Sequence, residues 1–135
     1  MRVLLDTHVL LWVLTDSSKL SPTAAAAYRN PENELYVSAA SLWEIGIKIS
    51  LGKLVLQNDW ATTITNELER NGIRWLPIEM AHCLTVATLP FHHRDPFDRL
   101  LVAQAQHEDM ALLTADATLP SYGVKIIWEL ATKEL

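Results

Sequence analysis

Apolar and polar positions divide the chain into short unbroken apolar runs and longer segments with helical spacing. The apolar runs are typical of strands buried on both faces, and they predict strands at residues 2–5, 35–37, 73–78, 111–114 and 124–128. The other segments predict helices at residues 9–14, 21–30, 38 or 41 to 52, 58–71, 79–88 and 95–107. Strands alternating with helices indicate an α/β fold in which helices flank a central parallel sheet.

Several of the predicted helix boundaries carry a specific signal. Ser21 precedes Pro22, which is the pattern of an N-cap followed by proline at the first helical position. Gly52 marks the end of another helix, because glycine is the residue most common just after a helix. Its start stays open, because Ser38 and Ser41 are both suitable N-caps.

Four carboxylates lie where predicted strands end or predicted helices begin. Asp6 and Asp116 each follow a strand, whereas Glu44 and Asp98 are expected in the first turns of helices. These ends meet at one edge of a parallel sheet, so the four acids can converge on one cleft. Burying an acid is costly unless it has a partner, and the apolar runs beside these four acids, at 3–5, 41–47, 100–103 and 111–114, contain no basic residue. We therefore interpret the partner as a metal ion.

The donor types select the kind of ion. Several carboxylates with no cysteine among them and only scattered histidine favour a hard cation, Mg²⁺ or Mn²⁺. Such an ion bridges a phosphodiester, neutralises its developing charge and activates water. Clustered acids also repel one another, so at least one of them should have a raised pKa in the metal-free protein.

All four acids also have a purely structural interpretation, and that of Asp98 is its favourable position near a helix N-terminus, where helix architecture alone could explain it. Asp6 can cap the helix that follows it. Glu44 lies three residues after Ser41, which is the spacing of a capping box. Asp116 can start a turn. Each acid is ambiguous when taken alone, and the metal hypothesis depends on the set.

The segment around Asp98 is the hardest to divide between structure and function. Asp95 is a good N-cap, and both acids complement the positive end of a helix. Helix architecture does not explain the histidines at 92–93, or Arg94 and Arg99, which can hold an anion such as phosphate. The histidine pair is a weaker candidate for metal binding, because adjacent side chains in an extended loop point apart.

Composition and charge narrow the class of protein. The chain has 135 residues, half of them hydrophobic and a fifth charged, which predicts one globular domain over residues 1–135. A net charge of −5 argues against non-specific binding of phosphates over a basic surface. Nucleic acid must then be bound through a local patch or a metal, and the excess acid suits a basic protein partner.

Cysteine usage and hydropathy suggest a cytoplasmic protein. The single cysteine, Cys83, excludes an intramolecular disulfide, and we expect it to be a small buried hydrophobe. Asp6 and His8 interrupt the apolar N-terminal stretch, so no signal peptide is expected. No apolar run approaches the roughly 20 residues of a membrane span.

Four segments of the chain, in this order and spacing, carry a family resemblance. They read LLDTH at 4–8, SAASLWE at 38–44, DPFDRLLVAQA at 95–105 and LTAD at 113–116, and the third is the most specific. Together they make essentially the whole chain resemble a PIN domain, specifically a VapC-type toxin of a toxin–antitoxin pair.

The resemblance implies a PIN-like three-layer fold and a Mg²⁺- or Mn²⁺-dependent endoribonuclease. It implies an acidic quartet, which is Asp6, Glu44, Asp98 and Asp116. Thr7 and Thr114 match family hydroxyls near the metal, and Asp95 is a cap, a group just outside the ligands, or both. Family members commonly form homodimers and are silenced by a protein antitoxin that occupies the cleft.

We therefore expect a metal-dependent ribonuclease toxin with RNA as its substrate. Three basic residues are expected to contact the RNA backbone: Arg94, Arg99 and Lys48. No histidine is needed as a general base. One alternative is a non-catalytic PIN-like module for protein assembly or RNA binding, and another is a metal-dependent phosphatase acting on small esters. The five tryptophans are expected mostly in the core, with one or two free to receive a partner.

Overall fold

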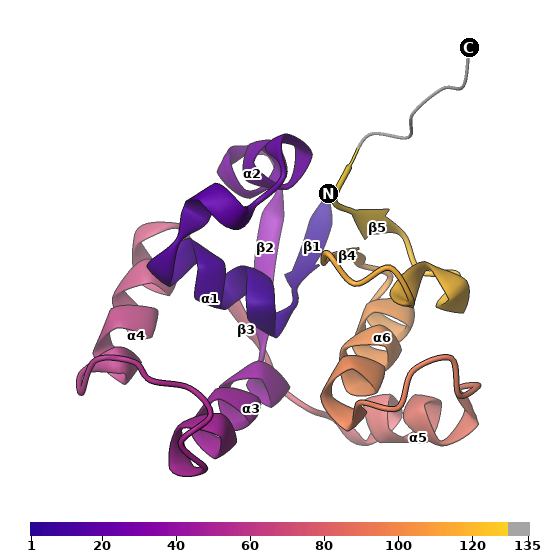
Figure 1. Ribbon diagram of the computed structural model, residues 1–135. Helices are drawn as coiled ribbons and strands as arrows, with labels where there is room; N and C mark the ends of the chain where they lie inside the picture. Colours follow the sequence, from indigo (N-terminus) through magenta and orange to yellow (C-terminus); the bar gives the residue numbers. More distant parts are fainter. Residues whose placement is uncertain (130–135) are drawn as a thin grey trace.

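The computed structural model of the protein describes residues 1–129 and contains one parallel sheet in the order β3-β2-β1-β4-β5 (Figure 1). The strands are β1 (Arg2–Leu5), β2 (Glu34–Ser38), β3 (Arg74–Leu76), β4 (Ala111–Leu113) and β5 (Ile126–Ile127). The central strand β1 pairs in parallel on both sides, with Val3 opposite Leu35 of β2 and Ala111 of β4. The predicted parallel sheet is thus confirmed. The last part of the predicted domain, residues 130–135, lies outside the described residues.

Helices connect the strands and follow the local signals closely. They are α1 (Thr7–Thr15), α2 (Pro22–Arg29), α3 (Ala39–Ser50), α4 (Trp60–Arg70), α5 (Met80–Thr88) and α6 (Pro96–Glu108), with short 3₁₀ turns η1 (Ser17–Lys19) and η2 (Leu119–Tyr122). Ser21 caps α2 by accepting the N–H of Ala24, as its position before proline predicts. Ser38, not Ser41, caps α3.

Two apolar clusters cover the two faces of the sheet. Along β1, Val3 and Leu5 face the cluster formed with α1, α2, α3 and α4, while Leu4 faces the cluster formed with α6. The two groups of helices lie on opposite sides of the sheet in Figure 1. All three β1 side chains are fully buried, and such a side chain stabilises the fold by roughly 1.5–3 kcal/mol. This arrangement confirms the predicted three-layer fold.

Three apolar or weakly polar side chains, one cysteine and two tryptophans, lie on the surface. Cys83 is exposed, so the prediction of a buried hydrophobe is wrong. Its neighbour His82 takes the inward position of α5, which turns Cys83 outward. Trp43 and Trp75 are 63% and 46% exposed, which leaves two tryptophans free to meet a partner.

Within residues 1–129, no helix is long and apolar enough to cross a membrane.

Candidate metal centre

Asp6 serves as a helix cap and as a cleft residue at once. Its Oδ1 accepts the N–H of Val9 at 2.7 Å, which caps α1. Its Oδ2 accepts the hydroxyl of Thr114, at the end of the neighbouring strand β4. Burial raises the pKa of Asp6 although these two hydrogen bonds work to lower it. The cap interpretation therefore does not exclude Asp6 from a metal site.

Asp98 lies in the first turn of α6, and Asp95 is the residue that caps this helix. Oδ1 of Asp95 accepts the N–H groups of Phe97 at 2.8 Å and of Asp98 at 3.2 Å. Burial raises the pKa of Asp98 to about 7, and the negative charge of Asp95 adds to the shift. The expectation of at least one raised pKa is thus met by both Asp6 and Asp98, and the largest single cause at each is desolvation.

Asp116 divides its two carboxylate oxygens between a turn and the cleft. Oδ1 accepts the N–H of Thr118 at 2.9 Å and its hydroxyl at 2.7 Å. Oδ2 faces the ring of His93. Burial works to raise the pKa of Asp116, but the hydrogen bonds from Thr118 and His93 outweigh it and leave that pKa below its ordinary value. The turn interpretation and the site interpretation hold together.

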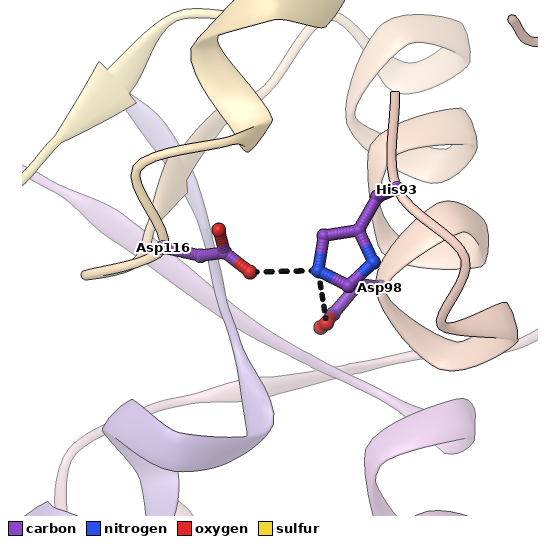
Figure 2. A group of neighbouring side chains, drawn as sticks. All are labelled: His93, Asp98 and Asp116. Atoms are coloured by element: carbon purple, nitrogen blue, oxygen red, sulfur yellow. Dashed lines mark hydrogen bonds and ion pairs between the residues drawn. The ribbon is translucent and has the colours of Figure 1, made fainter. Parts of the chain in front are cut away.

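His93 lies between two of these carboxylates, which the sequence did not reveal. Its Nε2 is 2.9 Å from Oδ2 of Asp116 and 3.3 Å from Oδ2 of Asp98 (Figure 2). The three groups place their polar atoms within 4.8 Å of one another, close enough to surround an ion. His92 instead packs against the ring of Tyr122. The two histidines point apart, as expected, but His93 points into the site. Its position two residues before the cap Asp95 is the only signal for this orientation in the sequence.

Glu44 lies deeper in its helix than expected. Because α3 begins after Ser38, Glu44 is in the second turn and forms no capping box with Ser41, whose hydroxyl accepts that of Thr7 at 2.9 Å. The buried Glu44 carboxylate meets a basic partner after all, with its Oε2 2.7 Å from Nζ of Lys48 one turn later. Its Oε1 is buried without a hydrogen-bond partner among the described residues.

The acids border a small cavity at the carboxyl edge of the sheet. It measures about 290 Å³ and is lined by Asp6, His8, Trp12, Asp98, Ala115 and Asp116. Glu44 is not among the residues that line this cavity, but it lies within electrostatic reach of it, since its charge acts to raise the pKa of both Asp6 and Asp98. Thr114 links two of the acids, because its hydroxyl donates to Asp6 and accepts the N–H of Asp116 at 3.1 Å.

Of the three basic residues expected to contact RNA, Arg94 is exposed, whereas Arg99 and Lys48 are held by contacts within the protein. The prediction for Arg99 is wrong. Its buried guanidinium donates to the carbonyls of Pro90 at 2.8 Å and Val86 at 3.3 Å, and it stacks on Phe91. These carbonyls lie at the end of α5 and just after it, where the regular helical hydrogen bonds run out, and Arg99 supplies donors to them. Lys48 is held by Glu44, although it is partly exposed.

The donor set fits a hard divalent cation. Three carboxylates surround one cavity, and a buried oxygen of the fourth acid lacks a hydrogen bond within residues 1–129. A buried carboxylate oxygen with no donor is costly, and a cation is the partner that satisfies it. After burial, the charges of Asp95, Asp6 and Glu44 add to the raised pKa of Asp98, which indicates that these acids lie within electrostatic reach of one another.

Comparison with known proteins agrees with this geometry. The family model of the PIN domain matches residues 3–125. Ribonuclease VapC22 of Mycobacterium tuberculosis is 30% identical over 123 residues, which cover 89% of this chain and 91% of that protein.

Solved structures share the fold at low sequence identity. A complex of VapBC2 from Rickettsia felis with a DNA fragment from their promoter has a TM-score of 0.71 at 14% identity, over 96% of this chain and 100% of that one. VapBC-1 from nontypeable Haemophilus influenzae has a TM-score of 0.67 at 16% identity, over 93% and 96%. With a family match over most of its length, this chain belongs to the PIN-domain family.

Proposed function

We propose that this protein is a metal-dependent endoribonuclease and acts as the toxin of a toxin–antitoxin pair. The observation that carries the proposal is the convergence of Asp6, Asp98 and Asp116 on one cavity, while the charge of Glu44, which has a buried oxygen without a hydrogen-bond partner among the described residues, acts on Asp6 and Asp98. The PIN-domain membership and the 30% identity to a VapC ribonuclease support the choice of RNA as substrate.

In this proposal the four acids hold Mg²⁺ or Mn²⁺. When bound, the ion neutralises charge developing on the phosphodiester and activates a water molecule for in-line attack. The chain keeps its ligands in place through hydrogen bonds: Thr114 orients Asp6, and Thr118 orients Asp116. Asp95 fixes the first turn of α6 and therefore the position of Asp98. Thr7, in α1, donates to the hydroxyl of Ser41 and so ties α1 to α3, the helix that carries Glu44.

The substrate surface in this proposal combines one cation with an aromatic pair. Arg94 is exposed and close in sequence to Asp98. Trp43, which is 63% exposed, meets the ring of Phe97 at 5.5 Å, and these two residues immediately precede Glu44 and Asp98. Exposed aromatic rings stack on the bases of single-stranded RNA with little sequence preference. Stacking beside the acids offsets the scarcity of basic residues in a chain of net charge −5.

The test separates the ribonuclease from its two alternatives. The purified protein with Mn²⁺ is incubated with a single-stranded RNA and, separately, with a simple aryl phosphate, and Asp6→Asn is the matched control. We expect internal cleavage of the RNA by the unaltered protein alone and no hydrolysis of the aryl phosphate. Aryl phosphate hydrolysis without RNA cleavage would establish a phosphatase. RNA binding without cleavage would establish a non-catalytic module.

The toxin role predicts a protein inhibitor whose chemistry complements the cleft. We propose that a basic segment of an antitoxin directs an Arg or Lys side chain toward Asp6 and Asp98, replacing the cation electrostatically. Expression of the chain alone should arrest growth, and the product of an adjacent gene should relieve the arrest. Inhibition that persists after every basic residue of that segment is neutralised would contradict occupation of the cleft.

We also propose that the protein forms a homodimer. The mass of the protein in solution tests this proposal.

A further inference from the structure

The hydrogen bonds of the His93 ring identify which of its nitrogens carries the proton. Nδ1 is 3.0 Å from the backbone nitrogen of Asp95, which always carries a hydrogen. Nδ1 must therefore accept this hydrogen bond through its lone pair and hold no proton. The ring proton is then on Nε2, which faces Asp116 at 2.9 Å and Asp98 at 3.3 Å. In this arrangement the Nε2–H of His93 donates to both carboxylates.

This protonation pattern does not suit a metal ligand. Histidine binds a metal through a nitrogen lone pair, while the other nitrogen donates its proton to an acceptor. In His93 the nitrogen beside the carboxylates is the donor, and the other nitrogen faces an N–H group rather than an acceptor. Moving the proton to Nδ1 would place two donors against each other at 3.0 Å. Proximity to the acids alone therefore overstates the role of His93 in holding an ion.

The loop that carries His93 is held to the rest of the fold by hydrogen bonds. The N–H of His93 donates to the hydroxyl of Tyr122 at 2.9 Å. The buried guanidinium of Arg99 donates to the carbonyl of Pro90, at the start of the same loop. The N–H that fixes the ring belongs to Asp95, the residue that caps α6. The orientation of His93 is thus part of the helix start that also positions Asp98.

We infer that His93 is a hydrogen-bond donor of the active site, whose Nε2–H contacts a phosphate oxygen of the RNA while the neighbouring carboxylates hold the ion. The inference rests on the proposed ribonuclease function. Without metal, the same N–H holds Asp98 and Asp116 together (Figure 2). Once these carboxylates turn their lone pairs to a cation, a phosphate oxygen is the acceptor that the substrate brings to the same place. His93 thereby assists binding and charge stabilisation without entering the ligand set.

Nitrogen NMR of the ring tests the protonation pattern directly. The full chain, labelled with ¹⁵N at histidine, is examined without metal and then with Mg²⁺, which is diamagnetic. We expect Nδ1 of His93 to lack a proton and Nε2 to carry one in both states. Transfer of the proton from Nε2 to Nδ1 on addition of Mg²⁺ would show ligation and overturn the inference.

Two substitutions test the role in RNA cleavage against the role in metal binding. In His93→Ala we expect Mn²⁺ affinity, measured by calorimetry, to stay the same or to increase, while kcat/KM for RNA falls at least about tenfold, as loss of one charge-stabilising donor implies. His93→Gln, whose amide N–H can donate, should recover part of kcat/KM. His92→Ala, which alters the neighbouring ring outside the cleft, is the control for Mn²⁺ affinity.

The outcomes distinguish this inference from the proposed function. A loss of Mn²⁺ affinity of at least about tenfold in both His93 variants, with the unaltered protein cleaving RNA, would make His93 a ligand and overturn the inference alone. Unchanged kcat/KM in His93→Ala would also overturn it. An unaltered protein that neither binds Mn²⁺ nor cleaves RNA would overturn the proposed function, and the inference with it.

Discussion

Two histidines in this protein have the same hydrogen-bond arrangement in opposite electrostatic surroundings. The backbone N–H of Glu79 meets Nδ1 of His82 at 3.0 Å, as that of Asp95 meets Nδ1 of His93. Nε2 of His82 is 3.0 Å from a carboxylate of Glu108, and Nε2 of His93 is 2.9 Å from Asp116. The two pairs lie near opposite ends of α6.

The difference lies in how the negative charge is balanced. Glu108 also meets the guanidinium of Arg2 at 3.8 Å, and the hydrogen bond from His82 holds the pKa of Glu108 below its ordinary value. At the other end of α6, the pKa of Asp116 is also lowered, because hydrogen bonds from Thr118 and His93 outweigh its burial, but burial raises the pKa of Asp98 beside it to about 7. The same histidine arrangement therefore completes a structural network around Glu108, whereas beside Asp116 it leaves a second carboxyl, Asp98, whose ionised form burial disfavours.

The largest effect is expected from removing the charge of Asp98. Asp98→Asn should lower RNA cleavage by at least about 100-fold, because several kilocalories of metal-dependent charge stabilisation depend on the ligands. Its free energy of unfolding without metal should equal or exceed that of the unaltered protein, because a buried charge is removed. Cleavage assays and urea unfolding in EDTA measure the two effects. Destabilisation by more than about 2 kcal/mol would favour a purely structural role at the helix start.

Glu108→Ala should produce the opposite pattern. It leaves the fully buried His82 ring without its acceptor, which should cost about 1–3 kcal/mol of unfolding free energy. The folded fraction should cleave RNA at the unaltered rate, because Glu108 is remote from the acids at the other end of α6. The same two assays apply. Loss of cleavage with unchanged stability would break the contrast between the two regions.

The pH dependence of stability should have opposite signs in the two regions. The pKa of Asp98 rises from an ordinary 3.8 to about 7 on folding, so its contribution is fully present below pH 3.8 and is lost as pH rises through about 7. The lowered pKa of Glu108 gives a contribution that is present above 4.5 and is lost as pH falls through its folded-state value. Urea unfolding in EDTA at a series of pH values measures both. A stability curve for Asp98→Asn that falls as steeply between pH 4 and 7 as the unaltered one would be inconsistent with this assignment.

The smallest effect concerns the cap of α6. Asp95→Asn should keep most of the stability, whereas Asp95→Ala should lose about 1 kcal/mol, since asparagine caps a helix and alanine does not. Asp95→Ala should also weaken Mn²⁺ binding by misplacing Asp98. Melting temperature and Mn²⁺ affinity of both variants decide the point. Equal and large losses of Mn²⁺ affinity in the two variants would show that Asp95 is itself a ligand.

Local sequence signals predicted the elements of this fold well, because each signal acts within one turn. Ser21 before Pro22 and Asp95 before Pro96 start α2 and α6 as predicted. The unbroken apolar run at 2–5 is the buried central strand. Since parallel strands share one carboxyl edge, the convergence of Asp6 and Asp116 also followed from their positions after strands.

The misjudged residues depend on contacts between distant segments. His93 points into the cleft because Tyr122 and Asp95 hold its loop, and Arg99 is buried because carbonyls at and just after the end of α5 accept hydrogen bonds from its guanidinium. Glu44 was placed one turn too early because two serines could cap α3 and only packing selects between them. Such choices depend on the whole fold and not on local spacing.

Metal dependence of RNA cleavage is the decisive test of the proposed function. The purified protein, freed of metal by EDTA, is given single-stranded RNA without metal, then with Mg²⁺, and then with Mn²⁺. We expect cleavage with either ion and none in EDTA, because the carboxylates alone cannot activate water for attack on phosphorus. Full cleavage in excess chelator would contradict the proposed metal-dependent function.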